Sequence, residues 1–335
     1  MDKQTQKVVA LKKIFSAFQN ATDAQRTYRE ITFLRQLRNH PCIVNLLAVH
    51  RAENDSDIYL VFECLETDVH AVIRAKILLD VHHRYIFWQL LCALKYIHSA
   101  GLIHRDIKPS NLLISSDASI KVCDFGLARA YNIDVPNDDL TDYIATRWYR
   151  APEILFGSSS YTTAVDMWAA GCILAELVSG RPLFPGTSTM DQLERVIAFS
   201  GPPSATDIES MDSSFTQTML SNLSYSKPRF VLEEKLEGAP SDAIDLIKQL
   251  IAFNPNNRPT AAQCLFHPYV AQFHNPAKEP LAKEMIKMAL NDSERHSLRE
   301  YRTQIYKEAV TPLEGSGRRS RSTVHKVVYS AGAKL

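Results

Sequence analysis

Three short motifs in a fixed order constrain this chain more than any other feature of its sequence. "HRDIKPSN" runs from His104 to Asn111, "DFG" from Asp124 to Gly126, and "APE" from Ala151 to Glu153. A single triplet is a weak signal, because it occurs by chance in many chains. The ordered set spans fourteen residues, of which about eleven count as fixed by the pattern. At roughly one in twenty per position, a coincidence is on the order of 10⁻¹⁴ per starting point. The set therefore points to one kind of site.

Composition excludes several classes of protein. The 335 residues are 45% hydrophobic with a formal net charge of +1, so the chain can bury a large core and gives no global sign of a nucleic-acid or membrane partner. Six scattered cysteines contain no C-x-x-C pair, which argues against a zinc site or a disulfide framework. The N-terminus has no apolar signal segment, and Gln89 and Lys95 interrupt the longest apolar stretch. We expect a cytoplasmic protein, and the basic tail also allows a nuclear location.

The hydrophobic pattern changes along the chain. Runs such as "VVAL" and "IYLVFE" alternate with a helical pattern up to about residue 65, and apolar residues then recur every three or four positions, as in "RYIFWQLLCALKYIHSAG". In the tail, Ser297-x-x-Glu300 predicts a capping box that opens a short helix with Leu298, Tyr301 and Ile305 on one face. The basic segment "GSGRRSRSTVHK" follows it. That segment can be a solvated tail, a nuclear-import or nucleic-acid patch, or a phosphorylation target.

With Val9-Ala10-Leu11-Lys12 upstream and Glu30 in the first helical segment, the motifs resemble those of the eukaryotic protein kinases. The resemblance implies an α+β fold of two lobes, with residues 1–65 forming a small lobe, 66–272 a mainly helical large lobe, and 273–335 a tail. It also implies ATP and Mg²⁺ as cofactors and protein serine or threonine as substrate.

Phosphoryl transfer asks a protein mostly for positioning and charge neutralisation. By resemblance, Asp106 orients the substrate hydroxyl and accepts its proton. Lys108 lies two residues further on, so in an extended loop it points to the same side and can neutralise the γ-phosphoryl group. Asn111 and Asp124 supply a neutral and a charged oxygen to a magnesium ion.

Other residues are expected to hold the nucleotide. Lys12 binds the α- and β-phosphates and is held by Glu30; the alternative is a solvated strand lysine, a part that Lys13 can play. Phe62 lies behind the adenine, and the backbone from Glu63 to Leu65 hydrogen-bonds the base. Two further assignments stay open. Asp68 either reaches the ribose or caps a helix, and Cys123 either borders the pocket or is a small buried apolar residue.

A hydroxyl, an acid and a phenol at Thr141-Asp142-Tyr143 resemble the dual-phosphorylation lip of the mitogen-activated protein kinases. An isolated triplet of this kind is usually an ordinary polar loop. The basic residues favour a lip: Arg29, Arg105 and Arg129 match the arginines that this family gathers around its phosphothreonine, and Arg147 and Arg150 match those that receive the phosphotyrosine. Phosphorylation of such a lip would order the loop and align Glu30 with Lys12.

Within that family the chain is most similar to the mitogen-activated protein kinase 15 type, over about residues 6 to 272. The resemblance implies a kinase that prefers serine or threonine followed by proline. Male-germ-cell-associated kinases also carry Thr-Asp-Tyr, so the subfamily is the less secure assignment. Ala277 and Lys278 stand where typical members have two acids, so we do not expect docking of basic peptides there.

Two further carboxylates are expected to be structural. Glu153 should pair with Arg258 in "NPNNRPT", and Asp166 in "DMW" should hold the backbone of the "HRD" loop. Because buried charges need partners, loss of either carboxylate should disturb the large lobe.

The start of the sequence leaves the competence of the chain open. Only Met1 to about Lys7 precede the "VVALKKIF" strand, too few for two strands and a glycine-rich turn. We therefore expect weak ATP binding, a marginal small lobe and an exposed sheet edge. Three interpretations remain: an active kinase, a scaffold that has lost its grip on nucleotide, and an incomplete part of a longer enzyme.

Overall fold

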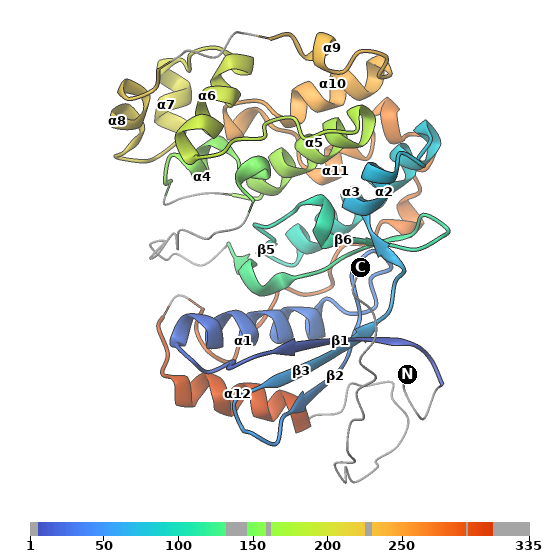
Figure 1. Ribbon diagram of the computed structural model, residues 1–335, viewed down its shortest axis with the longest axis vertical. Helices are drawn as coiled ribbons and strands as arrows, with labels where there is room; N and C mark the ends of the chain where they lie inside the picture. Colours follow the sequence, from blue (N-terminus) through green and yellow to red (C-terminus); the bar gives the residue numbers. More distant parts are fainter. Residues whose placement is uncertain (1–5, 132–145, 159–161, 225–229, 293, 311–335) are drawn as a thin grey trace.

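The computed structural model describes residues 6–131, 146–158, 162–224, 230–292 and 294–310. They form two lobes of unequal size (Figure 1). The small lobe contains the strands β1 (Val9–Ile14), β2 (Leu46–Arg51) and β3 (Ile58–Glu63) and the helices α1 (Ala21–Gln36) and α12 (Leu298–Val310). The family fold expected from the motifs, a small sheet-containing lobe beside a mostly helical one, is confirmed.

The large lobe contains the remaining elements. Its helices are α2 (Val69–Ala75), α3 (Asp80–Ser99), α4 (Pro152–Leu155), α5 (Ala164–Ser179), α6 (Thr189–Ser200), α7 (Ala205–Ser210), α8 (Thr216–Ser221), α9 (Leu232–Lys235), α10 (Ser241–Leu250) and α11 (Ala261–Cys264). Its short strands are β4 (Thr67–Asp68), β5 (Leu102–Ile103), β6 (Leu112–Ile114), β7 (Ile120–Val122) and β8 (Arg129–Ala130). Single 3₁₀ turns occur at η1 (Pro109–Asn111), η2 (Phe125–Leu127), η3 (Arg147–Tyr149), η4 (Pro255–Asn257), η5 (Pro268–Val270) and η6 (Pro276–Lys278).

The small sheet is antiparallel in the order β1-β3-β2, which sets Lys12 opposite Leu60. In the part of the chain that the structure describes, β1 is the outer strand, and Leu11 and Phe15 are 49% and 72% exposed. The exposed apolar edge expected at "VVALKKIF" is therefore present. Helix α1 lies across the sheet and begins where the Asn20 side chain accepts a hydrogen bond of 2.9 Å from the N–H of Asp23.

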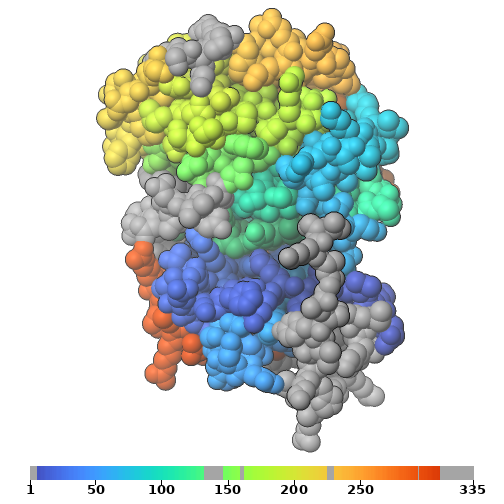
Figure 2. Space-filling model, viewed as in Figure 1, coloured from blue at the N-terminus to red at the C-terminus, as the bar shows by residue number. Residues whose placement is uncertain are grey.

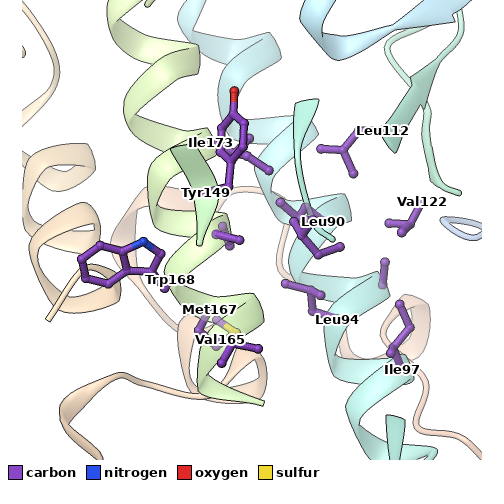
Figure 3. Close-up of a cluster of buried hydrophobic side chains, with 14 of the residues drawn as sticks. Leu90, Leu94, Ile97, Leu112, Val122, Tyr149, Val165, Met167, Trp168 and Ile173 are labelled. Atoms are coloured by element: carbon purple, nitrogen blue, oxygen red, sulfur yellow. The ribbon is translucent and has the colours of Figure 1, made fainter. Parts of the chain in front are cut away.

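The large lobe is built on α3 and α5, whose side chains meet in the cluster that Figure 3 shows. Leu90, Leu94 and Ile97 recur at helical spacing on α3 and are fully buried, as the sequence pattern predicts. Helix α5 is buried on almost every side, and its Trp168 ring stacks on Phe184 with the ring centroids 5.8 Å apart. This rigid base positions the loops that carry the site.

Helix α12 returns to the small lobe, although the sequence assigned it only to a tail. Figure 1 shows it beside α1 and β2, and in Figure 2 the orange-red segment lies against the blue small lobe. The predicted capping box is confirmed, because Glu300 Oε2 accepts from the N–H of Ser297 at 2.8 Å and Ser297 Oγ accepts from the N–H of Glu300 at 3.3 Å. Tyr301 and Ile305 are buried as expected, whereas Leu298 remains 37% exposed.

None of the described helices has the length and apolar character that crossing a bilayer requires.

Candidate active site

The loop between β5 and β6 carries "HRDIKPSN", and Asp166 on α5 fixes its shape. Asp166 is 1% exposed and accepts hydrogen bonds from the backbone N–H of His104, at 2.8 Å, and of Arg105, at 2.9 Å. Burial raises its pKa, but the hydrogen bond from His98 and the other donors outweigh that, so the pKa of Asp166 lies below its usual value. Arg105 has φ of 68°, a strained conformation for this residue. The predicted role of Asp166 in holding this backbone is confirmed.

His104 connects this loop to the DFG segment. Its side chain is fully buried, with Nε2 3.1 Å from the carbonyl oxygen of Cys123 and the imidazole 4.8 Å from the Phe125 ring. Asp124 has φ of 63°, in the left-handed region. The two loops are thereby fixed relative to each other, with Asp106 and Asp124 on them.

Asp106, Lys108 and Asn111 meet on the same loop. Lys108 is extended, with φ of −158°, and its Nζ lies 2.7 Å from Asp106 Oδ2. Asn111 Nδ2 donates to the carbonyl oxygen of Asp106 at 2.8 Å and to its Oδ2 at 2.9 Å. The alternation that placed Lys108 on the same side as Asp106 is thus seen in the structure. A carboxylate held by two donors is well oriented to accept a proton.

Across the lobes, Lys12 links the small sheet to α1 and to the DFG segment. Its Nζ lies 2.7 Å from Glu30 Oε1 and 3.7 Å from Asp124 Oδ1. Burial lowers the pKa of Lys12, but the two carboxylates outweigh it, and the pKa lies above its usual value. Lys13 pairs with Asp57 at 2.9 Å instead. Lys12 is therefore a cation aimed into the space between the lobes, whereas Lys13, expected to be a solvated strand lysine, forms an ion pair with Asp57.

The residues expected around the nucleotide base lie on and after β3. Phe62 is buried at 9% exposure, and the N–H of Glu63 donates to the carbonyl oxygen of Asn45 at 3.3 Å. Glu63 can thus offer a base its carbonyl oxygen but not its N–H, and Leu65 follows in the connection between lobes. Asp68 caps α2, since its Oδ1 accepts from the N–H of Ala71 at 2.9 Å. The capping alternative is correct, and the contact to a ribose stays a prediction.

Cys123 is half-buried just before Asp124. Burial raises the pKa of its thiol to about 12, so it is uncharged at neutral pH. An uncharged, half-buried thiol fits the interpretation as a small apolar residue, and a place at the border of the nucleotide pocket stays a prediction.

The donor set at the loops fits a magnesium ion. Because Nδ2 of Asn111 bonds Asp106, its Oδ1 is the atom left for a cation, and the Asp124 side chain is 46% exposed. Mg²⁺ is usually held by one or two protein oxygens, with water and substrate phosphates completing its shell. No group of three or more His, Cys, Asp or Glu side chains that could hold a metal occurs among the described residues.

The five arginines expected to read phosphate come from several elements. Arg29 lies on α1 and is buried against Asp292, with Nε 2.7 Å from Oδ1. Arg129 is on β8 opposite Ile103, and Ile103 precedes Arg105 by two residues. Nη1 of Arg105 donates to the carbonyl oxygen of Leu127 at 3.3 Å. Arg147 opens η3, and Arg150 follows it. Thr141 and Tyr143 lie outside the described residues, so their phosphorylation stays a prediction.

Two contacts support the segment after the lip. Arg258 forms the expected bidentate pair with Glu153, at 2.7 and 2.9 Å, and both side chains are buried. In the second contact, which no sequence motif indicates, the Tyr149 hydroxyl donates to Glu176 Oε2 at 2.6 Å. Burial raises the pKa of Glu176 above its usual value. Asp292 was missed as well, because its partner Arg29 is distant in sequence.

Comparisons with known proteins agree with this geometry. The family model for the protein kinase domain matches residues 1–270. The chain is 55% identical over 314 residues to extracellular signal-regulated kinase 2 of Dictyostelium discoideum, an alignment that covers 92% of this chain and 85% of that protein.

Two further relatives are longer than this chain. Mitogen-activated protein kinase 15 of Xenopus laevis is 49% identical over 341 residues, covering 100% of this chain and 58% of that protein. Extracellular signal-regulated kinase 7 of Drosophila melanogaster is 46% identical over 312 residues, covering 91% and 34%. The chain therefore belongs to the protein kinase family, whose members use ATP to phosphorylate proteins, and within it to the mitogen-activated protein kinases, a group of serine/threonine kinases.

Proposed function

We propose that this protein transfers the γ-phosphoryl group of ATP to serine or threonine hydroxyls that precede a proline. The observation that carries the proposal is the cluster of Asp106, Lys108 and Asn111, which hydrogen bonds hold in one orientation. Lys12 and Asp124 form an ion pair between the lobes beside it. Membership of the mitogen-activated group supports the proline preference. The presence of every residue expected for the chemistry speaks against a scaffold that has lost its activity.

Each side chain has one task in the transfer. Asp106 orients the substrate hydroxyl and accepts its proton as the oxygen attacks the γ-phosphorus and the bond to ADP breaks. Lys108, 2.7 Å from Asp106, neutralises charge on the transferred group. Lys12 holds the α- and β-phosphates and is itself held by Glu30.

Magnesium, when bound, neutralises phosphate charge and orients the leaving group. Asp124 and Asn111 are the residues that would hold it. The hydrogen bonds from Asn111 Nδ2 to Asp106 keep the amide turned so that Oδ1 faces away from that carboxylate. The same contacts thus serve the metal site and the base.

We also propose that phosphates on Thr141 and Tyr143 regulate the enzyme. The arginines that would receive them come from α1, from the catalytic loop, from β8 and from η3, and therefore from both lobes. A phosphate brings nearly two negative charges and three acceptors, so it would draw such a set together.

Replacing Lys108 by Met tests the assignment. We expect kcat to fall about 100-fold, the usual cost of removing one charge that stabilises a transition state, with little change in KM for ATP. The measurement is phosphate transfer from magnesium-ATP to a peptide containing Ser-Pro, beside a matched Ser-Ala peptide.

Lys248→Met is the matched control, since Lys248 lies on α10 and pairs with Glu233 on the surface. The control should keep wild-type kinetics. Equal rates for wild type and Lys108→Met would contradict the catalytic role, and equal rates on the two peptides would contradict the proline preference.

A further inference from the structure

A buried ion pair joins α1 to the segment that leads into α12. Arg29 and Asp292 are 6% and 7% exposed, and Arg29 Nε lies 2.7 Å from Asp292 Oδ1. The two residues are 263 positions apart in the chain. Arg29 immediately precedes Glu30, the partner of Lys12, so whatever fixes Arg29 also fixes the catalytic ion pair.

Residues 286–292, here called the α1 strap, run along this helix. The strap starts on the large lobe, where the N–H of Ile286 donates to the carbonyl oxygen of Ala100 at 2.9 Å. It then reaches α1: the Gln36 amide binds both backbone groups of Lys287, at 2.7 and 2.9 Å. The Tyr28 hydroxyl accepts from the N–H groups of Ala289 and Leu290, each at 3.1 Å.

Figure 1 shows helix α12, to which the strap leads, beside α1. The strap therefore ties α1 to the large lobe through its hydrogen bonds to Ala100 at one end and to Gln36 and Tyr28 along the helix.

The contact with Asp292 engages only part of the hydrogen-bonding capacity of the Arg29 guanidinium. Its Nη2 is buried and has no hydrogen-bond partner among the residues that the structure describes. A buried cation without an anion is costly, so a carboxylate at this place stabilises the inward position of the arginine. A guanidinium has five N–H donors, so a phosphate could bind Arg29 while Asp292 stays in contact.

We propose that Asp292 is a positioning residue for phosphoryl transfer, acting through Arg29 to hold α1 where Glu30 meets Lys12. Its carboxylate gives Arg29 a permanent anionic partner, so the placement of α1 does not depend on lip phosphate. The inference rests on the proposed function, in which phosphothreonine 141 is the other anion that Arg29 would bind.

A second ion pair between the C-terminal segment and α1 provides a matched control. Glu308 on α12 lies 2.9 Å from Arg35, in the last turn of α1. Glu308→Gln and Asp292→Asn both remove one carboxylate charge from the C-terminal segment and leave the side chain the same size. Only Asp292 faces the residue next to Glu30. A simple anchoring role would make the two substitutions equivalent.

The experiment compares wild type, Asp292→Asn, Glu308→Gln, Arg29→Gln and the double variant Arg29→Gln/Asp292→Asn. Each protein is prepared as the phosphatase-treated form and with phosphothreonine incorporated at 141. Hydrogen exchange over Ala21–Gln36 reports the placement of α1 without requiring activity, and kcat on a Ser-Pro peptide is measured beside it.

In the phosphatase-treated form we expect Asp292→Asn to speed exchange in α1 and lower kcat about tenfold, an ordinary size for coupling between sites. Phosphothreonine should restore both. In the Arg29→Gln background the same change should add less than about twofold, since it acts through that arginine. Glu308→Gln should behave alike in both forms.

An Asp292→Asn effect that is unchanged by phosphothreonine, equal to that of Glu308→Gln, or fully additive with Arg29→Gln would overturn the inference. Inactivity of the wild type in both forms would instead count against the proposed function, and hydrogen exchange in α1 would still decide the role of Asp292.

Discussion

At the residue scale, the positions whose type is dictated by chemistry were the ones that could be predicted. Asp106 and Lys108 had to share a side of an extended loop, and Nζ lies 2.7 Å from Oδ2. Asp68 shows the limit of such reasoning, because its local sequence fitted both a ribose contact and a helix cap. Only the hydrogen bond from the N–H of Ala71 to its carboxylate, seen in the structure, shows that it caps the helix. Arg29 was assigned to phosphate, but its carboxylate partner comes from a distant segment with no local sequence signal.

His40 makes the fold sensitive to pH. It is 2% exposed and stacks on Tyr96, and burial lowers its pKa to about 4. The unfolded chain accepts the proton below about pH 6.5, whereas the folded chain resists it until about pH 4. Stability is therefore fully present above pH 6.5 and is lost as pH falls. We expect this residue to lower the free energy of unfolding by about 2 kcal/mol between pH 7 and pH 5.

Denaturant titrations of wild type and His40→Asn at the two pH values measure this contribution. The asparagine oxygen can still accept the hydrogen bond that His40 Nδ1 accepts from the N–H of Cys42. The variant should lose less stability between pH 7 and pH 5 than the wild type. An equal loss in the two proteins would show that His40 does not titrate as described.

At the element scale, helices with strong periodicity were predicted and their long-range partners were not. The capping box located the start of α12, and the spacing placed Tyr301 and Ile305 on one face. That this face packs on α1 and β2 depends on surfaces made by residues far earlier in the chain, which periodicity cannot report. Leu298 was expected on the same face, but at the first position of the helix it remains partly exposed.

Ile305 tests how firmly α12 is attached. It is fully buried, so Ile305→Ala should cost about 2 to 5 kcal/mol and release α12 from α1. Leu298→Ala is the control within the same helix and should cost less than about 1 kcal/mol. Thermal melts with hydrogen exchange over Leu298–Val310 make the comparison. Similar losses for both variants would contradict the burial that separates them.

At the scale of the whole molecule, several polar connections join one lobe to the other. The ion pair of Lys12 with Asp124, at 3.7 Å, crosses the gap between the lobes, and the α1 strap crosses it as well. A third connection is backbone pairing, in which the N–H of Val44 donates to the carbonyl oxygen of Val122 at 3.0 Å. The family pattern predicted the pair of Lys12 with Glu30 inside the small lobe, but not the contact of Lys12 with Asp124. The other two depend on the tertiary arrangement and became evident only in the structure.

The central claim is that Asp106 serves as the base of a protein kinase site. Phosphate transfer from magnesium-ATP to a Ser-Pro peptide, measured for wild type and Asp106→Asn of equal thermal stability, tests it most directly. Asparagine keeps an oxygen for Lys108 but cannot accept the proton, so we expect the wild type to transfer phosphate and the variant to be slower by about 10² to 10⁴. Equal phosphate incorporation by the two proteins would contradict the account.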